Sequence, residues 1–392
     1  MVAVISNLFG LQHLDLTEDI VSEAFLQAAE SWSIKGMPDN PTAWLYSVAK
    51  HLTSHYFKRH KTFSRKIVPA LITGQEGPAL PQDPDFSDGN IMDSQLKMLF
   101  AICNPAIISE AQIGLALRIL CGFGIDEIAE AFLTNKETIN KRLFRAKEKL
   151  RKENVLLEMP RGPEINNRLD NVLHIIYLLF NEGYYSTTKN ETLRKDLCVE
   201  ALHLGVLLTG LETTNLPQTN ALIALMCFHA SRFRARQGGD SSLILYEDQD
   251  KDLWDDELIN KGEYFLALSA RGPEMTSYHL EARIAWWHCQ KNDPPEKWGK
   301  ILQLYNQLLL INYSPSVALN RTYALFKAKG AKPALIEAMK LKLDNNHFYF
   351  TLLGELYKNI GDKNAKACFE KAYALATTHN DKEILMRKIS GL

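Results

Sequence analysis

The stretch IDEIAEAFLTNKETINKRLFRAKEKLRK, residues 125–152, decides how the chain around it folds. Two apolar runs recur in it at helical spacing, one at Ile125, Ile128, Ala129 and Phe132 and the other at Ile139, Leu143, Ala146 and Leu150. They predict two short helices joined so tightly that they cross steeply, with Ala129 as the small residue at the crossing. Thr134 and Glu137 have the spacing of a capping box that begins the second helix. Together these features predict a helix-turn-helix.

The second of these helices is strongly basic. Residues 134–152 contain eight Lys and Arg against two Glu, in a chain whose 45 basic and 46 acidic residues nearly cancel. Near the exposed start of the helix, side chains that can reach base edges in a major groove are Lys136, Thr138, Asn140 and Lys141. Arg142 and Arg145 lie farther along and suit phosphates. The alternative is an ordinary solvated helix face.

The length and composition indicate a globular protein of two or three domains. The chain has 392 residues, of which 46% are hydrophobic, and its net charge of −1 excludes a uniformly basic nucleic-acid coat. Its six cysteines lie far apart, without the Cys/His spacing of a zinc site. They predict reduced thiols in a cytoplasmic protein, and neither a signal peptide nor a membrane-length apolar run is expected.

An acidic helix is predicted from Asp15 to Trp32. Its apolar stripe consists of Ile20, Ala24, Phe25 and Ala28, and its opposite face carries Asp19, Glu23 and Gln27. The loop KGMPDNPTAW follows, in which Asn40 or Thr42 can cap a new helix.

The new helix is basic and carries aromatic side chains among its charges. From Lys50 to Lys66 it has six Lys and Arg and no acid. Trp44, Tyr46, Tyr56 and Phe57 alternate with Lys50, Lys58 and Arg59, a pattern typical of a platform for single-stranded nucleic acid. The loop from Lys35 to Thr42 is the expected place for a flipped base. Trp44 can instead belong to the core, because it shares a stripe with Leu45 and Val48.

Residues 67–91 predict a linker. They include four prolines, three glycines and four acids, without any Lys or Arg. We therefore expect an all-α protein with domains at 1–66 and 92–157, a linker at 67–91, and a third domain at 158–392.

The third domain is a succession of amphipathic helices with a repeat-like end. In residues 350–376 the positions of small and large packing residues resemble those of a tetratricopeptide repeat, at Leu353, Gly354, Tyr357, Ala365, Phe369 and Ala372. We expect a helical array in which each helix pair packs on the next.

In this order, the elements resemble the extracytoplasmic-function sigma factors of bacterial RNA polymerase. The residues that carry the resemblance are LTEDIVSEAFLQAAESW, NPTAWLYSVAK and IDEIAEAFLTNKETINKRLFRAKEKLR. The segments LMCFHASRFRAR, LYEDQDKDLWD, YLLFNEGYYS and SPSVALNR are similar to the subgroup with a C-terminal tetratricopeptide-like extension. The chain begins inside the segment that matches the family's first helix.

The resemblance implies roles for particular residues. Asp19, Glu23 and Gln27 match the helix that docks on core polymerase. The residues that match the capture of the melted minus-10 strand are Lys35, Asn40, Trp44, Lys50, Lys58 and Arg59. The residues that match minus-35 recognition are Lys136, Thr138, Asn140, Lys141, Arg142 and Arg145. His51 and His55 replace the family's usual Asn and Asp, so no role is expected for them.

The third domain also contains a polar set that is unusual among helices rich in Leu and Ala. Its members are Asn181, Glu182, His229, Arg232, Arg236, Asp248, Gln249, Asp250 and Trp254. They can form a pocket for a ligand or for the sigma domains, or a network of salt bridges that fixes how helices cross. No nucleophile or metal ligand stands at a useful spacing from His229, so we expect no catalysis.

The leading hypothesis is a sigma factor that binds core RNA polymerase and promoter DNA, uses no cofactor and is regulated in cis by its C-terminal domain. The alternative is a helix-turn-helix regulator with a repeat-like interaction domain, which binds operator DNA without polymerase. An enzyme in the third domain is a remote third hypothesis.

Overall fold

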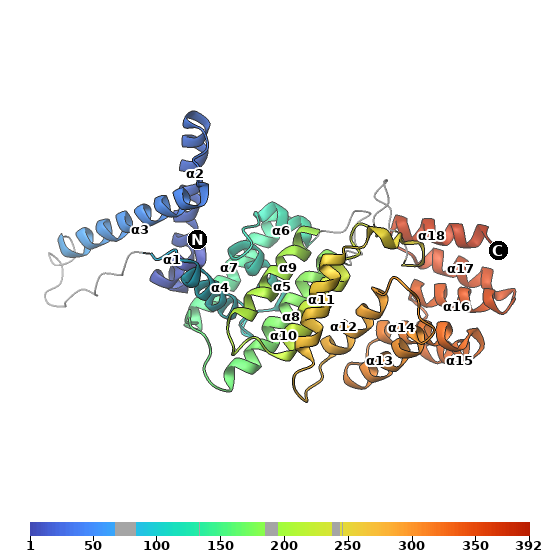
Figure 1. Cartoon of the computed structure of the whole chain (residues 1–392). Coiled ribbons are helices and arrows are strands. Elements are labelled where there is room, and N and C mark those ends of the chain that lie inside the picture. The colour runs from blue at the N-terminus through green and yellow to red at the C-terminus, as the bar shows by residue number, and fades with distance from the viewer. Residues whose placement is uncertain (67–83, 133, 185–194, 237–243, 245) are drawn as a thin grey trace. The chain divides into compact units, whose positions relative to one another are not determined.

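Figure 1 shows the protein as a computed structural model, which describes residues 1–66, 84–132, 134–184, 195–236, 244 and 246–392. Every regular element in these ranges is helical, which confirms the all-α prediction. None of the helices there is both long and apolar enough to cross a membrane. Internal contacts divide the chain into two units, Met1–Ile175 and Ile176–Leu392, and each is described by itself.

Unit 1 spans the residues that were expected to form two small domains. Its helices are α1 (Val2–Phe9), the short 3₁₀ turn η1 (Leu11–His13), α2 (Leu14–Lys35), α3 (Pro41–Lys66), α4 (Asp88–Ile102), α5 (Ser109–Ile119), α6 (Ile125–Ala131), α7 (Lys136–Lys152) and the first part of α8 (Glu164–Tyr184).

Unit 2 begins within α8 and continues as paired helices to the C-terminus (Figure 1). Its further elements are α9 (Lys195–Leu207), η2 (Leu208–Gly210), α10 (Pro217–Ala230), η3 (Tyr246–Asp248), η4 (Lys251–Leu253), α11 (Asp256–Ser269), α12 (Ser277–His288), α13 (Lys297–Ile311), α14 (Pro315–Lys329), α15 (Ala331–Leu341), α16 (His347–Asn359), α17 (Asn364–Leu375) and α18 (His379–Ser390).

The first three helices share a small apolar core formed by Ile5, Ile20, Ala24 and Ala49. The predicted stripe on α2 is confirmed for its small and branched members, but it is wrong for Phe25, whose side chain is exposed. Helix α2 also extends three residues beyond the predicted end at Trp32. It ends at Lys35 because Gly36 takes a positive φ of 80° and donates its N–H to the Trp32 carbonyl.

The start of α3 agrees with one of the two predicted caps. The Asn40 side chain accepts a hydrogen bond from the Ala43 N–H at 2.9 Å, and Pro41 occupies the first helical position. The polar side chain of Asn40 therefore orients the helix entry.

The end of the predicted linker is ordered. Phe86 stacks on Tyr46 of α3 with ring centroids 4.6 Å apart, and Asp85 accepts hydrogen bonds from the Ser87 N–H and hydroxyl. Helix α4 then begins at Asp88, inside the range expected to be linker. Residues 67–83 lie outside the described part of the chain.

Helices α5, α6 and α7 form the helix-turn-helix core. Residues 132–135 connect α6 to α7, and the Thr134 N–H bonds back to the Ala129 carbonyl at 2.9 Å. The predicted stripes are buried at Ile128, Ala129, Ile139, Leu143, Ala146 and Leu150. The predicted capping box is wrong, because Asn135 is the N-cap and accepts from the Thr138 N–H at 2.8 Å. Glu137 bonds to Lys141 instead.

Unit 1 continues past Leu157, where the second small domain was expected to end. Arg168 on α8 donates to the Phe100 carbonyl of α4. The Asn171 amide donates to the Cys103 carbonyl at 2.6 Å and to the Gln112 side chain of α5 at 3.0 Å. The first part of α8 is thus hydrogen-bonded to the helix-turn-helix domain.

Unit 2 uses the predicted interlock of small and large residues. A Cβ at Gly354 of α16 would lie 2.6 Å from the Phe369 ring of α17, so only glycine allows this approach. The same arrangement recurs in α10 and α11, where a Cβ at Gly262 would lie 2.6 Å from Phe228. The pattern seen at residues 350–376 therefore describes a real helix pair, and a second pair has a similar close contact.

Candidate functional site

The start of α7 presents its polar side chains to solvent. The ammonium groups of Lys136 and Lys141 each lie 2.6 Å from a carboxylate, that of Asp126 and that of Glu137 respectively. All four side chains are 63–76% exposed. Such pairs contribute ~0–1 kcal/mol, so a phosphate can replace the carboxylate at little cost.

The other side chains of α7 that are predicted to contact DNA differ in exposure and in how far their orientation is restricted. Arg145 and Asn140 are exposed, whereas Thr138 is half-buried beside the Asn135 cap. The Arg142 guanidinium lies 5.6 Å from the centre of the Phe132 ring. This contact holds Arg142 near the turn of the motif, where its orientation is restricted.

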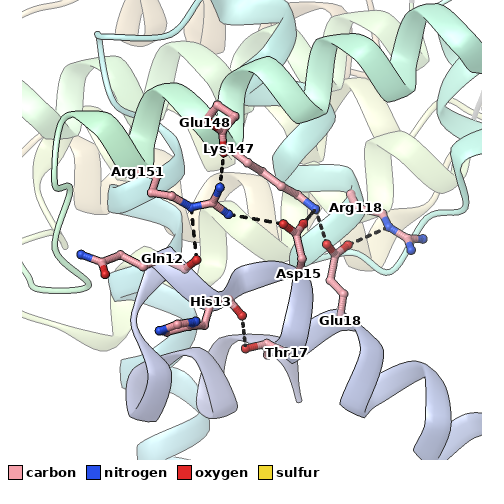
Figure 2. A network of polar contacts seen from close by, with 9 residues as sticks. All are labelled: Gln12, His13, Asp15, Thr17, Glu18, Arg118, Lys147, Glu148 and Arg151. Carbon is pink, nitrogen blue, oxygen red and sulfur yellow. Dashed lines mark hydrogen bonds and ion pairs between the residues drawn. The ribbon is translucent and has the colours of Figure 1, made fainter. Parts of the chain in front are cut away.

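The second half of α7 is in contact with the start of α2, as Figure 2 shows. The Lys147 ammonium bonds to Glu18 and lies 2.9 Å from Asp15, and the Arg151 guanidinium reaches Asp15 at 3.3 Å. Arg118 of α5 bonds to Glu18 at 3.0 Å. We call these five residues the α2–α7 network. The basic helix thus has an exposed end and a bound end.

The predicted minus-10 residues lie on α2, α3 and the loop between them. Lys35 and Lys50 are exposed, and Asn40 caps α3. Trp44 is half-buried, and its ring packs against that of Trp32 in an edge-to-face arrangement with ring centroids 5.5 Å apart. Both interpretations of Trp44 therefore stay open. Lys58 and Arg59 lie in α3, but their side chains are outside the described part of the structure.

The predicted polymerase-binding residues form an exposed face on α2. Asp19 and Glu23 are exposed, and the Gln27 amide donates to Glu23 at 2.9 Å. The same part of the helix exposes about half of the Phe25 and Leu26 side chains, at 52% and 53%. Sequence reasoning missed this apolar component, because Phe25 fitted a helical stripe that was assumed to be buried. Exposed aromatic and branched side chains beside acids are suited to docking another protein.

In unit 2 the structure brings part of the predicted polar set together around two tyrosines. Arg236 lies 4.0 Å from the centre of the Tyr184 ring, and the His229 ring lies 4.6 Å from it. Arg232 donates to the Tyr184 hydroxyl at 3.3 Å and lies 5.4 Å from the Tyr246 ring centre. The Trp254 ring stacks near Tyr246 at 6.3 Å. We call this group the unit 2 polar cluster.

The cluster is completed by residues that the sequence did not indicate. Buried Lys297 donates to the Tyr246 hydroxyl at 2.7 Å and to Asp293 at 2.5 Å, and the Tyr246 hydroxyl donates to the His288 carbonyl at 3.0 Å. Tyr184 and Tyr246 stand within segments that the resemblance already marked. Lys297 and Asp293 had no such signal, because four-residue spacing of Lys and Asp is common on exposed helices.

The histidines of the cluster are neutral at physiological pH. Burial, followed by the charges of Arg232 and Arg236, holds the pKa of His229 well below its usual value. Burial, Arg232 and Lys297 lower the pKa of His288 to about 3. Burial also raises the pKa of Tyr246 to about 12, so its hydroxyl keeps its proton. The cationic charge of the cluster therefore comes from arginine and lysine.

The other members of the predicted set do not join the cluster through any described contact. Asp248 and Asp250 are exposed, and Asp250 caps η4 by accepting from the Asp252 N–H at 2.9 Å. The Gln249 amide donates to the Ile244 carbonyl at 3.3 Å. Asn181 and Glu182 are half-buried at the end of α8.

The choice between a ligand pocket and a structural network stays open at this cluster. Arginine and lysine groups packed on rings, together with the Lys297–Asp293 pair, agree with a network that fixes helix crossings. Within the cluster, the described residues leave Nε1 of Trp254 and Nδ1 of His288 buried without a hydrogen-bond partner. They are the groups that a ligand would use under the other interpretation.

Fold and site define a class: an all-helical protein with a helix-turn-helix in its N-terminal unit and paired helices in its C-terminal unit. Residues 168–270 match a family described as a family of unknown function, DUF6596. This region covers the predicted polar set but not Lys297. No solved structure matches the chain.

A full-length relative shows the family. Uncharacterized protein R00370 of Rhizobium meliloti (strain 1021) is 31% identical over 385 residues, which cover 97% of this chain and 91% of the relative. The chain belongs to the same family as this protein. Because the similarity runs through both units, their combination is a property of the family and not of one chain.

Proposed function

We propose that the protein is a sigma factor that binds core RNA polymerase and directs it to promoter DNA. The observation that supports this most is the coexistence of two different exposed surfaces in unit 1. One is the basic start of α7 in a helix-turn-helix, and the other is the acidic and apolar face of α2. A DNA-binding regulator that acts alone has a use for the first surface and none for the second.

On this proposal, α7 reads the minus-35 element and the loop before α3 captures the opened minus-10 strand. Lys136, Asn140 and Lys141 contact base edges, and the exposed ion pairs of the two lysines are easily exchanged. Arg142 and Arg145 contact phosphates, as the resemblance implies. Asp19, Glu23 and Gln27 dock on core polymerase, with Phe25 and Leu26 supplying apolar area.

The deciding experiment is co-purification of the full chain with core RNA polymerase, followed by transcription from candidate promoters. We expect Glu23→Lys to abolish co-purification, because it reverses a charge in the centre of the acidic face. Glu110→Lys, the same charge reversal at an exposed residue outside α2, is the matched control. Binding to duplex DNA without any binding to core polymerase would support the operator-binding alternative and end the sigma proposal.

Residues on α7 are tested separately from polymerase binding. We expect Lys141→Ala or Arg142→Ala to reduce promoter-dependent transcription about 10-fold or more, as loss of a base or phosphate contact does. Co-purification should be unchanged. Lys152→Ala, at the exposed last turn of the same helix, is the control. If these changes removed polymerase binding instead, the role of α7 would be misassigned.

Regulation in cis by unit 2 is the remaining part of the proposal. The cut that tests it falls after Ile175, because Arg168 and Asn171 hydrogen-bond to α4 and α5 and belong to unit 1. A regulatory unit 2 predicts altered transcription by the truncated chain. Unchanged transcription would make unit 2 a passive extension.

A further inference from the structure

The α2–α7 network joins two surfaces to which the proposed function gives different partners. Asp15 lies in the first turn of α2, and residues 15, 19, 23 and 27 recur every four positions along one face of that helix. Asp15 is therefore the first member of the acidic face, and Lys147 and Arg151 already occupy it. The same two cations belong to the basic helix that would meet DNA.

The contacts of the network are more shielded than the pairs at the start of α7. The Lys147 and Glu18 side chains are 14% and 15% exposed, and Figure 2 shows the Lys147 ammonium between the two carboxylates. Burial lowers the pKa of Lys147, but hydrogen bonds to Glu18 and Asp15 outweigh it, so the net pKa is raised and the ammonium stays charged. The same bonds lower the pKa of Asp15 against the effect of burial.

A phosphate and a carboxylate compete for the same donors on lysine and arginine. The Lys147 ammonium has three donors, but Asp15 and Glu18 neutralise its charge and repel a DNA phosphate brought to the same nitrogen. Arg151 differs, because it is also paired with Glu148 of its own helix. Because linkage is reciprocal, whatever opens the network for one partner also uncovers the other surface.

We propose that the α2–α7 network is a reversible latch, in which Asp15 and Glu18 withhold Lys147 from phosphate until the contact opens. The inference rests on the proposed binding of DNA by α7 but not on any role of polymerase. In the latched protein, the proposed phosphate contacts of α7 are Arg142 and Arg145. In the open protein, Lys147 adds a third.

The test counts the cations that contact DNA. The logarithm of the association constant falls linearly with the logarithm of salt concentration, with a slope near −0.9 for each phosphate contact. The probe is a short duplex of arbitrary sequence, titrated with the full chain at several salt concentrations. We expect Asp15→Asn/Glu18→Gln to bind more tightly, with a slope steeper by about 0.9, the value for the freed Lys147, because Arg151 keeps its pair with Glu148.

Removal of two acids strengthens DNA binding for reasons of net charge alone, so a matched control is needed. Glu30→Gln/Glu110→Gln removes the same charge from two exposed residues of unit 1 outside the network. The latch predicts a change of slope only in the network variant. Equal slopes in the two variants, or no duplex binding by the network variant, would overturn the proposal.

A second pair of variants completes a double-mutant cycle. It also keeps the latch testable if the Asp15→Asn/Glu18→Gln variant fails to fold. Lys147→Gln should leave the slope of the otherwise unchanged chain as it is, because the latch already withholds this cation. In the Asp15→Asn/Glu18→Gln background it should erase the gain. A slope reduced by about 0.9 in the otherwise unchanged chain would show that Lys147 already contacts phosphate, which contradicts the latch.

Discussion

In unit 1, Lys147 lies between the carboxylates of Asp15 and Glu18, whereas in unit 2 Lys297 lies between the Tyr246 hydroxyl and Asp293. The Lys147 side chain is 14% exposed and that of Lys297 only 1%. The first lysine therefore has acids that phosphate or salt can replace. The second is enclosed by rings and a helix, with no such exchange open to it.

The comparison shows two uses of a charged contact. In the α2–α7 network it joins two helices that the latch requires to separate, and in the unit 2 polar cluster it belongs to packing that stays closed in the folded protein. The Asp15 side chain in the α2–α7 network is 60% exposed, so the strength of the network should depend on salt. The unit 2 polar cluster is dominated by cation–ring contacts and neutral histidines, and its energy is lost only when unit 2 opens. Four changes test this contrast.

The largest effect is expected from Lys297→Ala. It removes a buried ammonium and its stem and leaves the Tyr246 hydroxyl without its donor, so unit 2 should lose ~4 kcal/mol of its free energy of unfolding. Urea denaturation at low and high salt measures the loss, which should hardly depend on salt. Lys300→Ala, exposed on the same helix, should stay within ~0.5 kcal/mol. If Lys297→Ala lost as little free energy of unfolding as Lys300→Ala, the cluster would contribute no more to stability than an exposed surface residue does.

The next effect concerns two carboxyl groups with opposite pKa shifts. Burial raises the pKa of Glu281 from 4.5 to about 7, and its hydrogen bond from the Tyr177 hydroxyl only partly opposes this. The folded state then binds more protons than the unfolded state, so stability falls as pH rises between these two values. From about pH 5 to about pH 8 we expect unit 2 to lose ~2 kcal/mol through this group.

Glu281→Gln should remove that loss, because the amide keeps the shape without titrating. Asp15 is predicted to act with the other sign: its lowered pKa gives stability above the usual value of 3.8 that disappears as pH falls through the folded value. Thermal unfolding at a series of pH values separates the two. A pH profile that Glu281→Gln leaves unchanged would mean that this carboxyl is ionised in the folded protein.

A smaller effect is expected at the latch itself. In a double-mutant cycle of Glu18→Gln and Lys147→Gln, the coupling should be ~1 kcal/mol at low salt and should decrease at high salt. The corresponding cycle of Glu137→Gln and Lys141→Gln, an exposed pair on the same helix, should give less than ~0.5 kcal/mol. Equal couplings would remove the distinction between the two ends of α7.

The smallest effect on stability is expected at the start of α7. Lys136→Ala should change the free energy of unfolding by less than ~0.5 kcal/mol, since its pair with Asp126 is exposed. Because the proposed function places Lys136 at a base edge, promoter-dependent transcription should nevertheless fall about 10-fold, with co-purification with core polymerase unchanged. Unchanged transcription would remove Lys136 from the promoter contacts.

Much of the fold could be predicted from local pattern. Helical spacing placed the two stripes of the helix-turn-helix, and the buried Ile139 and Leu143 confirm it. The Gly354 and Phe369 interlock was visible for the same reason, because a small and a large residue at fixed offsets describe one close contact. Errors arose where two local rules competed. Asn135 and Thr134 both suit a helix cap, and the backbone bond from Thr134 to Ala129 left the cap to Asn135.

The candidate site could be predicted only in part, because a pattern does not say which side of a helix is covered. Phe25 lies at the helical spacing of core residues, yet its side chain is exposed. Lys147 belongs to a helix whose basic composition is typical of DNA binding, yet its ammonium is paired with Glu18. Both outcomes depend on a neighbour far away in sequence. In the same way, Lys297 joined the unit 2 polar cluster through Tyr246, which stands about fifty residues earlier.

The sequence by itself determined that this protein is helical, where its basic and acidic helices lie, and which residues can begin or interlock them, since these properties depend on residues within a few turns of one another. The tertiary structure alone decided which charges are available. Pairing Lys147 with Asp15, and Lys297 with Tyr246, requires segments distant in the chain to meet. Ion pairs and cation–ring contacts act over a few ångströms, so no local pattern can specify them.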